Sequence, residues 1–270
     1  MSNYVYLYEI VFTEEKMAHD LQKASAWKRI SAYIFDMILI IIVAVGVAFL
    51  LSTVLKYDTR VAEREQLRQS YQTEYGVSFD IKAEEYEKLS EQDRQRIDDA
   101  YFKFATDPDV TRISTAIVNL TLIIIVFSVL VPFVIFEFII PLLLGHGRTL
   151  GKRIFGIAII REDGVRMSTF QLFTRSILGK YTLETMIPVF LILAILFNVM
   201  SLVALVGLAV ILAVQLGLLL FSRLHAPIHD AIAGTVAVDF ASQRIFNTTQ
   251  ELLEYTKQQA AEAAQRAEYR

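Results

Sequence analysis

Long apolar runs alternate with charged segments along the chain of 270 residues. Two runs, 30–55 and 113–144, are each long enough for one helix across about 30 Å of hydrocarbon, which takes about 20 mainly apolar residues. A third run, 181–222, is too long for one span, and Asn198 and Ser201 near its middle predict a tight turn. The pattern therefore predicts an all-α membrane protein, a four-transmembrane-helix bundle. Its spans are expected at about 30–55, 113–144, 181–198 and 201–222.

A polar insert, 56–112, separates the first two spans. Ser90 followed by Asp93 is typical of a helix N-terminus, because a serine oxygen can accept from the free backbone N–H groups there. Asp107-Pro108-Asp109 then interrupts the helical pattern before the second span. We expect a solvated helical insert, which either has no chemistry of its own or forms a docking surface for a partner.

The segments around the third and fourth spans predict a small β element. Residues 154–160 and 235–239 are rich in β-branched residues and too short to cross a membrane, and 165–167 follows a turn signal at Gly164. Ser168 with Gln171 forms a capping box that opens a helix, expected to lie in the membrane interface before the third span. The tail, 241–270, is predicted to be helical.

Basic residues predict the orientation of the spans. The loop between spans two and three, 145–180, carries seven of them against two acidic residues, whereas the insert 56–112 carries ten basic and fourteen acidic residues. Both termini, including the N-terminal segment 1–27, are therefore expected in the cytoplasm, and the insert outside it. Residues 1–27 are acidic, unlike the basic start of a signal peptide, so the first span is expected to be retained.

Composition supports the membrane assignment. The chain is 54% hydrophobic with a mean hydropathy of +0.45, while soluble proteins contain about 45–50% apolar residues. The net charge of −3 gives no basis for nucleic-acid binding, and the absence of cysteine excludes disulfides and thiolate metal sites.

Two carboxylates lie inside the apolar runs. Asp36 is seven residues after Arg29, and Glu137 is seven residues before Leu144, so the two acids are expected at the same depth in neighbouring antiparallel helices. Ionisable groups inside spans are costly and are usually functional. Because two like charges at close range cannot both ionise cheaply, the pair could exchange a proton for a small cation. Alternatively, each acid is neutralised by a base such as Lys152 or Arg223 and only holds the helices together.

Pro141 adds a second open question. Proline cannot donate to the carbonyl four residues earlier, which belongs to Glu137. That freed carbonyl either contributes to a cation site, as in broken transporter helices, or marks a simple kink satisfied by water.

Other motifs do not predict an enzyme. Gly145 to Lys152 resembles a phosphate-binding loop, but His146 stands where the loop needs glycine, and Arg153 where it needs serine or threonine. Arg148, Lys152 and Arg153 are instead expected to contact anionic lipid headgroups. His225, His229 and Asp230 could suggest a metal, but Pro227 interrupts their spacing. We predict no cofactor, no metal and no catalytic residues.

Three segments together resemble the RDD family of membrane proteins, which is named for one arginine and two aspartates. Arg29 and Asp36 match the first segment, 147–156 with Asp163-Gly164 matches the central loop, and 229–238 with Asp230 matches the last. The resemblance covers residues 27–240 without the insert, and it implies a bacterial plasma-membrane protein. Transport of an unknown ligand, including sodium/proton antiport, has been suggested for some members, and others act as accessory proteins.

Two functions follow as hypotheses. In the first, the protein is a small transporter that exchanges a monovalent cation such as sodium for protons at Asp36 and Glu137. Arg29 sets the potential of this site, Asp230 and His229 gate its inner opening, and a homo-oligomer completes the pathway. In the second, it is a membrane adaptor or regulatory subunit whose insert and tail bind an unknown protein partner, and the buried charges only stabilise the bundle.

Overall fold

The computed structural model describes residues 21–222 and 226–268, so most of segment 1–27, together with Arg223 and His225, lies outside the described residues. Four helices are long and apolar enough to cross a membrane, and the described chain is otherwise mostly helical with one two-stranded sheet. The predicted all-α membrane fold is confirmed. The four membrane helices are Ala26–Val54, Pro108–Leu144, Thr169–Leu196 and Ser201–Phe221.

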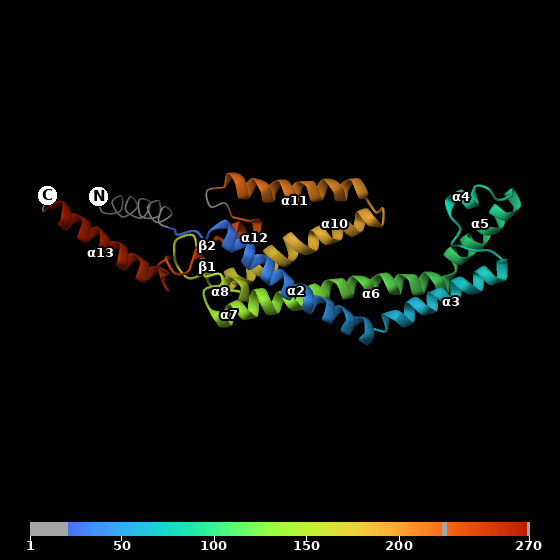
Figure 1. The fold of residues 1–270 in the computed structure, drawn as a ribbon, viewed down its shortest axis with the longest axis horizontal. Helices are drawn as coiled ribbons and strands as arrows, with labels where there is room; N and C mark the ends of the chain where they lie inside the picture. Colours follow the sequence, from blue (N-terminus) through green and yellow to red (C-terminus); the bar gives the residue numbers. More distant parts are fainter. Residues whose placement is uncertain (1–20, 223–225, 269–270) are drawn as a thin grey trace. The chain divides into compact units, whose positions relative to one another are not determined.

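The chain forms two compact units, residues 1–42 with 130–270, and residues 43–129. Helices α2 (Ala26–Val54) and α6 (Pro108–Phe133) run from one unit into the other (Figure 1). The first unit also contains these elements: η1 (Val134–Ile139), α7 (Ile140–Leu144), α8 (Leu150–Ile154), β1 (Ile157–Arg161), α9 (Thr169–Phe173), η2 (Thr174–Met186), α10 (Ile187–Leu196), α11 (Ser201–Phe221), α12 (Ile228–Ala233), β2 (Thr235–Asp239) and α13 (Thr249–Glu268).

The third membrane helix begins earlier than predicted. The Ser168 capping box is present, but the helix that it opens does not stop in the interface; α9, η2 and α10 continue as one helix to Leu196. Lys180 is therefore buried within this helix and does not mark its end. The sequence pattern missed this because Arg175 and Lys180 look like loop residues until their buried acidic partners are known.

The hairpin between the last two membrane helices has the predicted turn. Helix α10 ends at Leu196, and α11 begins at Ser201 and packs beside it (Figure 1). Asn198 and Met200 have positive φ angles of 54° and 51°. These left-handed residues reverse the chain within four residues, as the polar interruption indicated.

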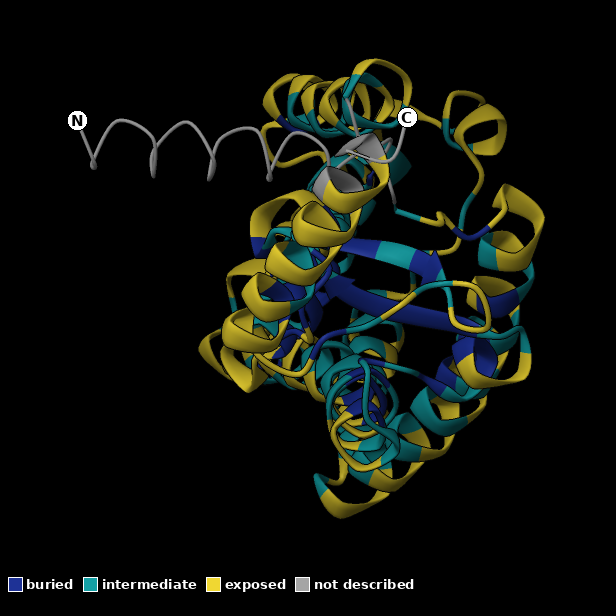
Figure 2. Cartoon of the chain, turned by 90° about the vertical axis from the view of Figure 1, so that its left-hand side faces the viewer, coloured by how far each residue is buried: buried dark blue, intermediate teal, exposed yellow. Residues whose placement is uncertain are grey.

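The small sheet joins segments from either side of the last hairpin. Strands β1 and β2 are antiparallel, with Ile157 opposite Asp239 and Arg161 opposite Thr235. Their apolar side chains are among the most buried in the chain, as the dark blue strands in Figure 2 show. The segment 165–167 was predicted as a strand but forms only isolated bridges. The Arg166 N–H donates to the Phe246 carbonyl at 2.8 Å. The predicted strand 154–160 also begins later, at Ile157, because 150–154 is helical.

The second unit holds the insert, which is helical as predicted. It contains α3 (Tyr57–Tyr75), α4 (Ala83–Tyr86) and α5 (Glu91–Thr106), and the Ser90 side chain caps α5 by accepting from the Asp93 N–H. The rings of Tyr71 from α3 and Phe79 from the intervening loop pack on Phe104 of α5, which is buried. The insert thus has a small core of its own.

Candidate functional site

Glu137 lies fully buried between two lysines. It belongs to η1, a π-helical turn. Such widened turns are rare in proteins, and those that occur are often at functional sites. Its carboxylate accepts a hydrogen bond from the Lys180 ammonium of η2, and the Lys152 ammonium of α8 lies 3.5 Å from the second carboxylate oxygen. The buried acid is therefore neutralised by bases from two other elements.

Pro141 has no N–H for the Glu137 carbonyl four residues earlier, and this carbonyl accepts a hydrogen bond from another side chain. The Ser176 hydroxyl of η2 donates to this carbonyl at 2.6 Å. The structure thus gives the freed carbonyl a protein donor, and the contact ties the second membrane helix to the third.

Asp36 is held by the loop that precedes α8. Its carboxylate accepts a hydrogen bond from the Thr149 hydroxyl at 2.5 Å and another from the Gly151 N–H at 2.8 Å. A Cβ on Gly151 would lie 2.4 Å from the Ala32 carbonyl oxygen of α2. Only glycine lets the loop approach α2 closely enough for these bonds.

The two membrane carboxylates were expected to face each other, but each is bonded to other groups instead. Glu137 pairs with lysines, and Asp36 with a hydroxyl and a backbone amide. Of the two neutralising bases considered from the sequence, Lys152 is a partner of Glu137, and Arg223 lies outside the described residues. A buried carboxylate is more stable beside a cation or donor than beside a second carboxylate, which explains the arrangement.

Asp230 forms a second buried pair with Arg175. The Arg175 Nε–H donates to the Asp230 carboxylate at 2.6 Å, and the Thr235 hydroxyl donates to the same oxygen at 2.8 Å. Burial alone would raise the pKa of Asp230, but the Arg175 guanidinium and these bonds hold it well below its ordinary value. Asp230 is therefore ionised and committed to Arg175.

His229 connects this pair to Glu184. Its Nδ1 lies 2.7 Å from the Glu184 carboxylate, and its Nε2 lies 3.1 Å from an Arg175 guanidinium nitrogen. Because Arg175 can only donate, Nε2 accepts and Nδ1 carries the proton. Burial lowers the pKa of His229, which agrees with this neutral form. Gly179 permits the contact, since a Cβ there would lie 2.6 Å from that of His229.

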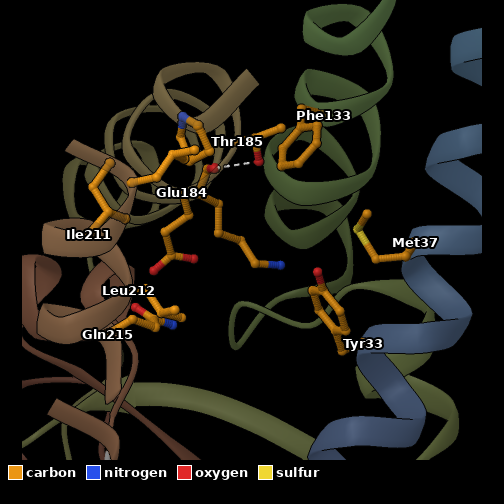
Figure 3. Close-up of a pocket in the computed structure, with 11 residues that line it drawn as sticks. Tyr33, Met37, Phe133, Glu184, Thr185, Ile211, Leu212 and Gln215 are labelled. Atoms are coloured by element: carbon orange, nitrogen blue, oxygen red, sulfur yellow. Dashed lines mark hydrogen bonds between the residues drawn. The ribbon is translucent and has the colours of Figure 1, made fainter. Parts of the chain in front are cut away.

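All three signature residues, Arg29, Asp36 and Asp230, line one cavity of about 460 Å³ within the first unit. An adjoining cavity of about 430 Å³ shares Tyr33, Lys180, Glu184 and Gln215 with it. Figure 3 shows Tyr33 of α2 and Glu184 of η2 reaching into this second space from opposite sides. Apolar side chains form most of the remaining wall.

The loop 145–149 is a structural turn in this structure. The Arg148 guanidinium donates to the Leu144 carbonyl at 3.2 Å and lies 4.2 Å from the Phe240 ring centre. Arg153 is exposed, whereas Lys152 on the same helix is buried in the charge cluster. Of the three bases expected at lipid headgroups, Lys152 thus faces the interior of the bundle.

Sequence reasoning missed five members of the cluster: Thr149, Arg175, Ser176, Lys180 and Glu184. A signal existed for three of them. Arg175, Lys180 and Glu184 follow one another at spacings of five and four, which brings them to one side of a π-widened helix. Among the described residues no group of three His, Cys, Asp or Glu side chains is placed to hold a metal ion.

The fold and the cavity define a class: a polytopic membrane protein with four apolar helices and a buried charge cluster at a cavity. The RDD family model matches residues 23–234, which is most of the chain. The chain belongs to the RDD family, as its motifs indicated. No curated protein and no solved structure matches it.

Proposed function

We propose that this protein is a small membrane transporter whose solute site is the cavity of the first unit, with protons as one transported or coupled ion. One observation carries the proposal: Arg29, Asp36 and Asp230, which come from distant parts of the chain, line the same cavity. Buried ionisable groups inside a bundle are costly and mark solute or ion paths by default.

Lys152 supplies a group that can exchange a proton near neutral pH. It lines the cavity, and burial lowers its pKa from 10.5 to about 8. Its partner Glu137 keeps a second lysine, Lys180, when Lys152 loses its proton. Lys152 can therefore lose its proton, and the charge of the cluster can change by one, while the Glu137 carboxylate keeps a cationic partner.

The contacts give less support to sodium as the solute. A sodium ion needs several oxygen ligands, and Asp36, Glu137 and Asp230 each already accept bonds from the protein, although Glu137 Oε2 has only the Lys152 ammonium at 3.5 Å among the described residues. A monovalent cation would have to displace the Thr149 hydroxyl or the Gly151 amide from Asp36, or a basic group from Glu137 or Asp230. Sodium/proton exchange stays one version of the proposal and is tested beside the others.

The proposal includes a homo-oligomer in the bacterial plasma membrane, with both termini in the cytoplasm. Four helices are few for a complete path, and in the last of them, α11, most residues are exposed and only Ala204 is buried. A second copy or lipid must cover this apolar face. The excess of basic residues in loop 145–168 supports a cytoplasmic side for that loop.

The test uses vesicles that contain the purified full chain and an internal pH-sensitive dye. We expect proton movement when a sodium, lithium or organic-acid gradient is imposed, and at least tenfold slower movement in Lys152→Met. Lys28→Gln is the matched control, because Lys28 pairs with Asp239 and does not line the cavity. Proton movement no faster than in empty vesicles, with every gradient, would refute the transport proposal.

An adaptor function is the second candidate, supported by the insert. Two adjacent rings on α5, Tyr101 and Phe102, are 57% and 68% exposed. Exposed aromatic pairs are frequent at protein interfaces. A photo-crosslinking residue at position 102 should capture one defined partner in intact membranes, and the same residue at Gln69, also exposed, should not. Equal labelling from both positions would count against this function.

A further inference from the structure

We propose, resting on the transport function above, that the cavity binds a small organic anion: an acidic group held by Arg29 and Lys152, with a short apolar chain along the wall. The argument rests on which hydrogen-bonding groups in the cavity are already used and which are not. The charges and the apolar lining then narrow the class of ligand.

Two cationic groups at the cavity keep unused donors. The Lys152 ammonium lies 3.5 Å from Glu137 but forms no hydrogen bond with any described residue, although Lys152 is buried. The buried Nε of Arg29 likewise has no hydrogen-bond partner within the described part of the chain. Buried donors without partners are rare and costly, so a ligand that supplies acceptor oxygens would be stabilised here.

The acidic groups at the cavity are already committed. Asp36 accepts from Thr149 and Gly151, and Asp230 accepts from Arg175 and Thr235. Glu184 accepts two bonds from His229, one from its ring and one from its backbone N–H. A ligand that offers donors or a positive charge would compete with these bonds, whereas an acceptor would not.

The charged residues that line the cavity also favour an anion. Four basic residues line the cavity, namely Arg29, Lys152, Arg175 and Lys180, against three acidic ones, Asp36, Glu184 and Asp230. Glu137, which balances the lysines, lies behind them and is not part of the lining. The surface that a ligand meets therefore carries an excess of one positive charge, which suits a monovalent anion.

The rest of the wall is apolar. Ile30 and Tyr33 of α2 face the cavity together with Leu219 of α11 and Pro227. The volume of about 460 Å³ lies within the range of about 300–1,000 Å³ typical of small-molecule sites. An inorganic anion would leave most of this wall uncovered, so the geometry favours an acid with an apolar chain. A free carboxylic acid and an anionic lipid share this chemistry.

The single tryptophan of the chain provides a local probe. Trp27 is 79% exposed and stands between the cavity residues Ala26 and Arg29 in the sequence of α2. In vesicles of phosphatidylcholine that contain only the full chain, its fluorescence reports on this end of the cavity. Octanoate is titrated at pH 7, with octanol and octylamine as controls of the same chain length.

We expect a saturable fluorescence change with octanoate and none with octanol or octylamine. Arg29→Gln and Lys152→Gln should each weaken octanoate binding about tenfold or more, because each removes a charge-assisted hydrogen bond. Lys28→Gln should bind as the parent does. Arg29→Lys keeps the charge and should bind more tightly than Arg29→Gln, which separates lost recognition from misfolding.

Equal responses to octanoate and octanol would overturn the inference, as would unchanged octanoate affinity in both Gln variants. Vesicles with added phosphatidylglycerol identify the source of the ligand. If this lipid weakens octanoate binding, the site is assigned to lipid headgroups. If octanoate binding is unchanged, the site is assigned to a soluble acid. Saturable binding without any proton movement in the vesicle assay would refute transport but retain the binding site. Proton movement without an octanoate response would refute only the anion.

Discussion

Single residues explain how the charge cluster is built, and Gly151 is the clearest case. It brings the loop before α8 against the Ala32 carbonyl of α2, and its own N–H then reaches the Asp36 carboxylate. The signature aspartate is thus tied to the central loop by one small residue. The two matching segments, 29–36 and 147–156, are one structural unit in space.

Gly151→Ala should lower the unfolding temperature strongly. A Cβ at 2.4 Å from a backbone oxygen must push the loop away and break the Asp36 bonds, a loss of about 1–3 kcal/mol or more. Gly46→Ala is the matched control, since nothing lies within 4 Å of that Cβ and alanine favours the helix. Thermal unfolding followed by Trp27 fluorescence measures both. Equal unfolding temperatures would contradict the role of Gly151.

Lys152 should make stability depend on pH in the alkaline range. Burial lowers its pKa to about 8 in the native state, from 10.5 in the unfolded chain. Between these values the unfolded state binds more protons, so the contribution of this group to stability increases as pH rises from 8 to 10.5. The difference in unfolding temperature between the parent and Lys152→Met should change with pH in this window. A constant difference would contradict the burial of a charged lysine.

At the scale of elements, η2 carries most of the cluster. This one helix supplies Arg175 to Asp230, Lys180 to Glu137 and Glu184 to His229. Its π-helical backbone brings these side chains to neighbouring elements, and the hydroxyls of Thr182 and Thr185 donate to carbonyls five residues earlier. This element lies between η1 and α12 and is joined to both by ion pairs and hydrogen bonds.

Arg175→Met should destabilise the protein by about 3–5 kcal/mol, because it leaves Asp230 buried and ionised without its partner. The double variant Arg175→Met with Asp230→Leu should regain much of that loss, since no bare charge remains. A double-mutant cycle in unfolding temperature separates the pair from its surroundings. Additive losses in the two single variants and the double would show that the pair is not coupled.

The insert should lose stability in acid through Asp107. The Tyr71 hydroxyl donates to its carboxylate at 2.7 Å and, with backbone bonds, lowers the pKa of Asp107. A carboxyl with a lowered native pKa stabilises the fold above its unfolded pKa, and this contribution disappears as pH falls. Tyr71→Phe should therefore reduce the protection of α5 from hydrogen exchange at pH 7 and weaken its pH dependence. Identical profiles would contradict this contact.

At the scale of the whole molecule, the four apolar helices leave much of their surface uncovered. In a bilayer, lipid would cover this surface, while the charge cluster lies inside the first unit. The surface of the membrane helices is thus apolar, while the charged side chains of the cluster are grouped inside the unit beside an apolar core. Eight basic or acidic side chains line this one cavity: Arg29, Asp36, Lys152, Arg175, Lys180, Glu184, His229 and Asp230.

The predicted orientation can be tested directly because the chain has no cysteine. Gln92→Cys in the insert should react with an impermeant maleimide in intact cells, and Gln250→Cys in the tail should react only after the cells are opened. Both positions are exposed, so access to the membrane face alone decides the result. The opposite pattern would invert the proposed topology.

The sequence by itself determined the elements of this protein. Apolar length set the membrane helices, Ser90 and Ser168 set two helix starts, Asn198 and Ser201 marked the hairpin, and ordered motifs identified the family. These features depend on neighbours in sequence, where hydrophobic length and capping act. The start of the third membrane helix was predicted wrongly, because the charged residues Arg175 and Lys180 are typical of a loop.

Only the tertiary structure decided what the buried charges do. Asp36 bonds to Thr149, 113 residues away, and Glu137 to Lys180, 43 residues away. The sequence placed Asp36 and Glu137 at one depth but could not choose between their facing each other and their facing bases. That choice depends on which side chains the packed helices bring within hydrogen-bond reach, and on the cost of burying a charge without a partner.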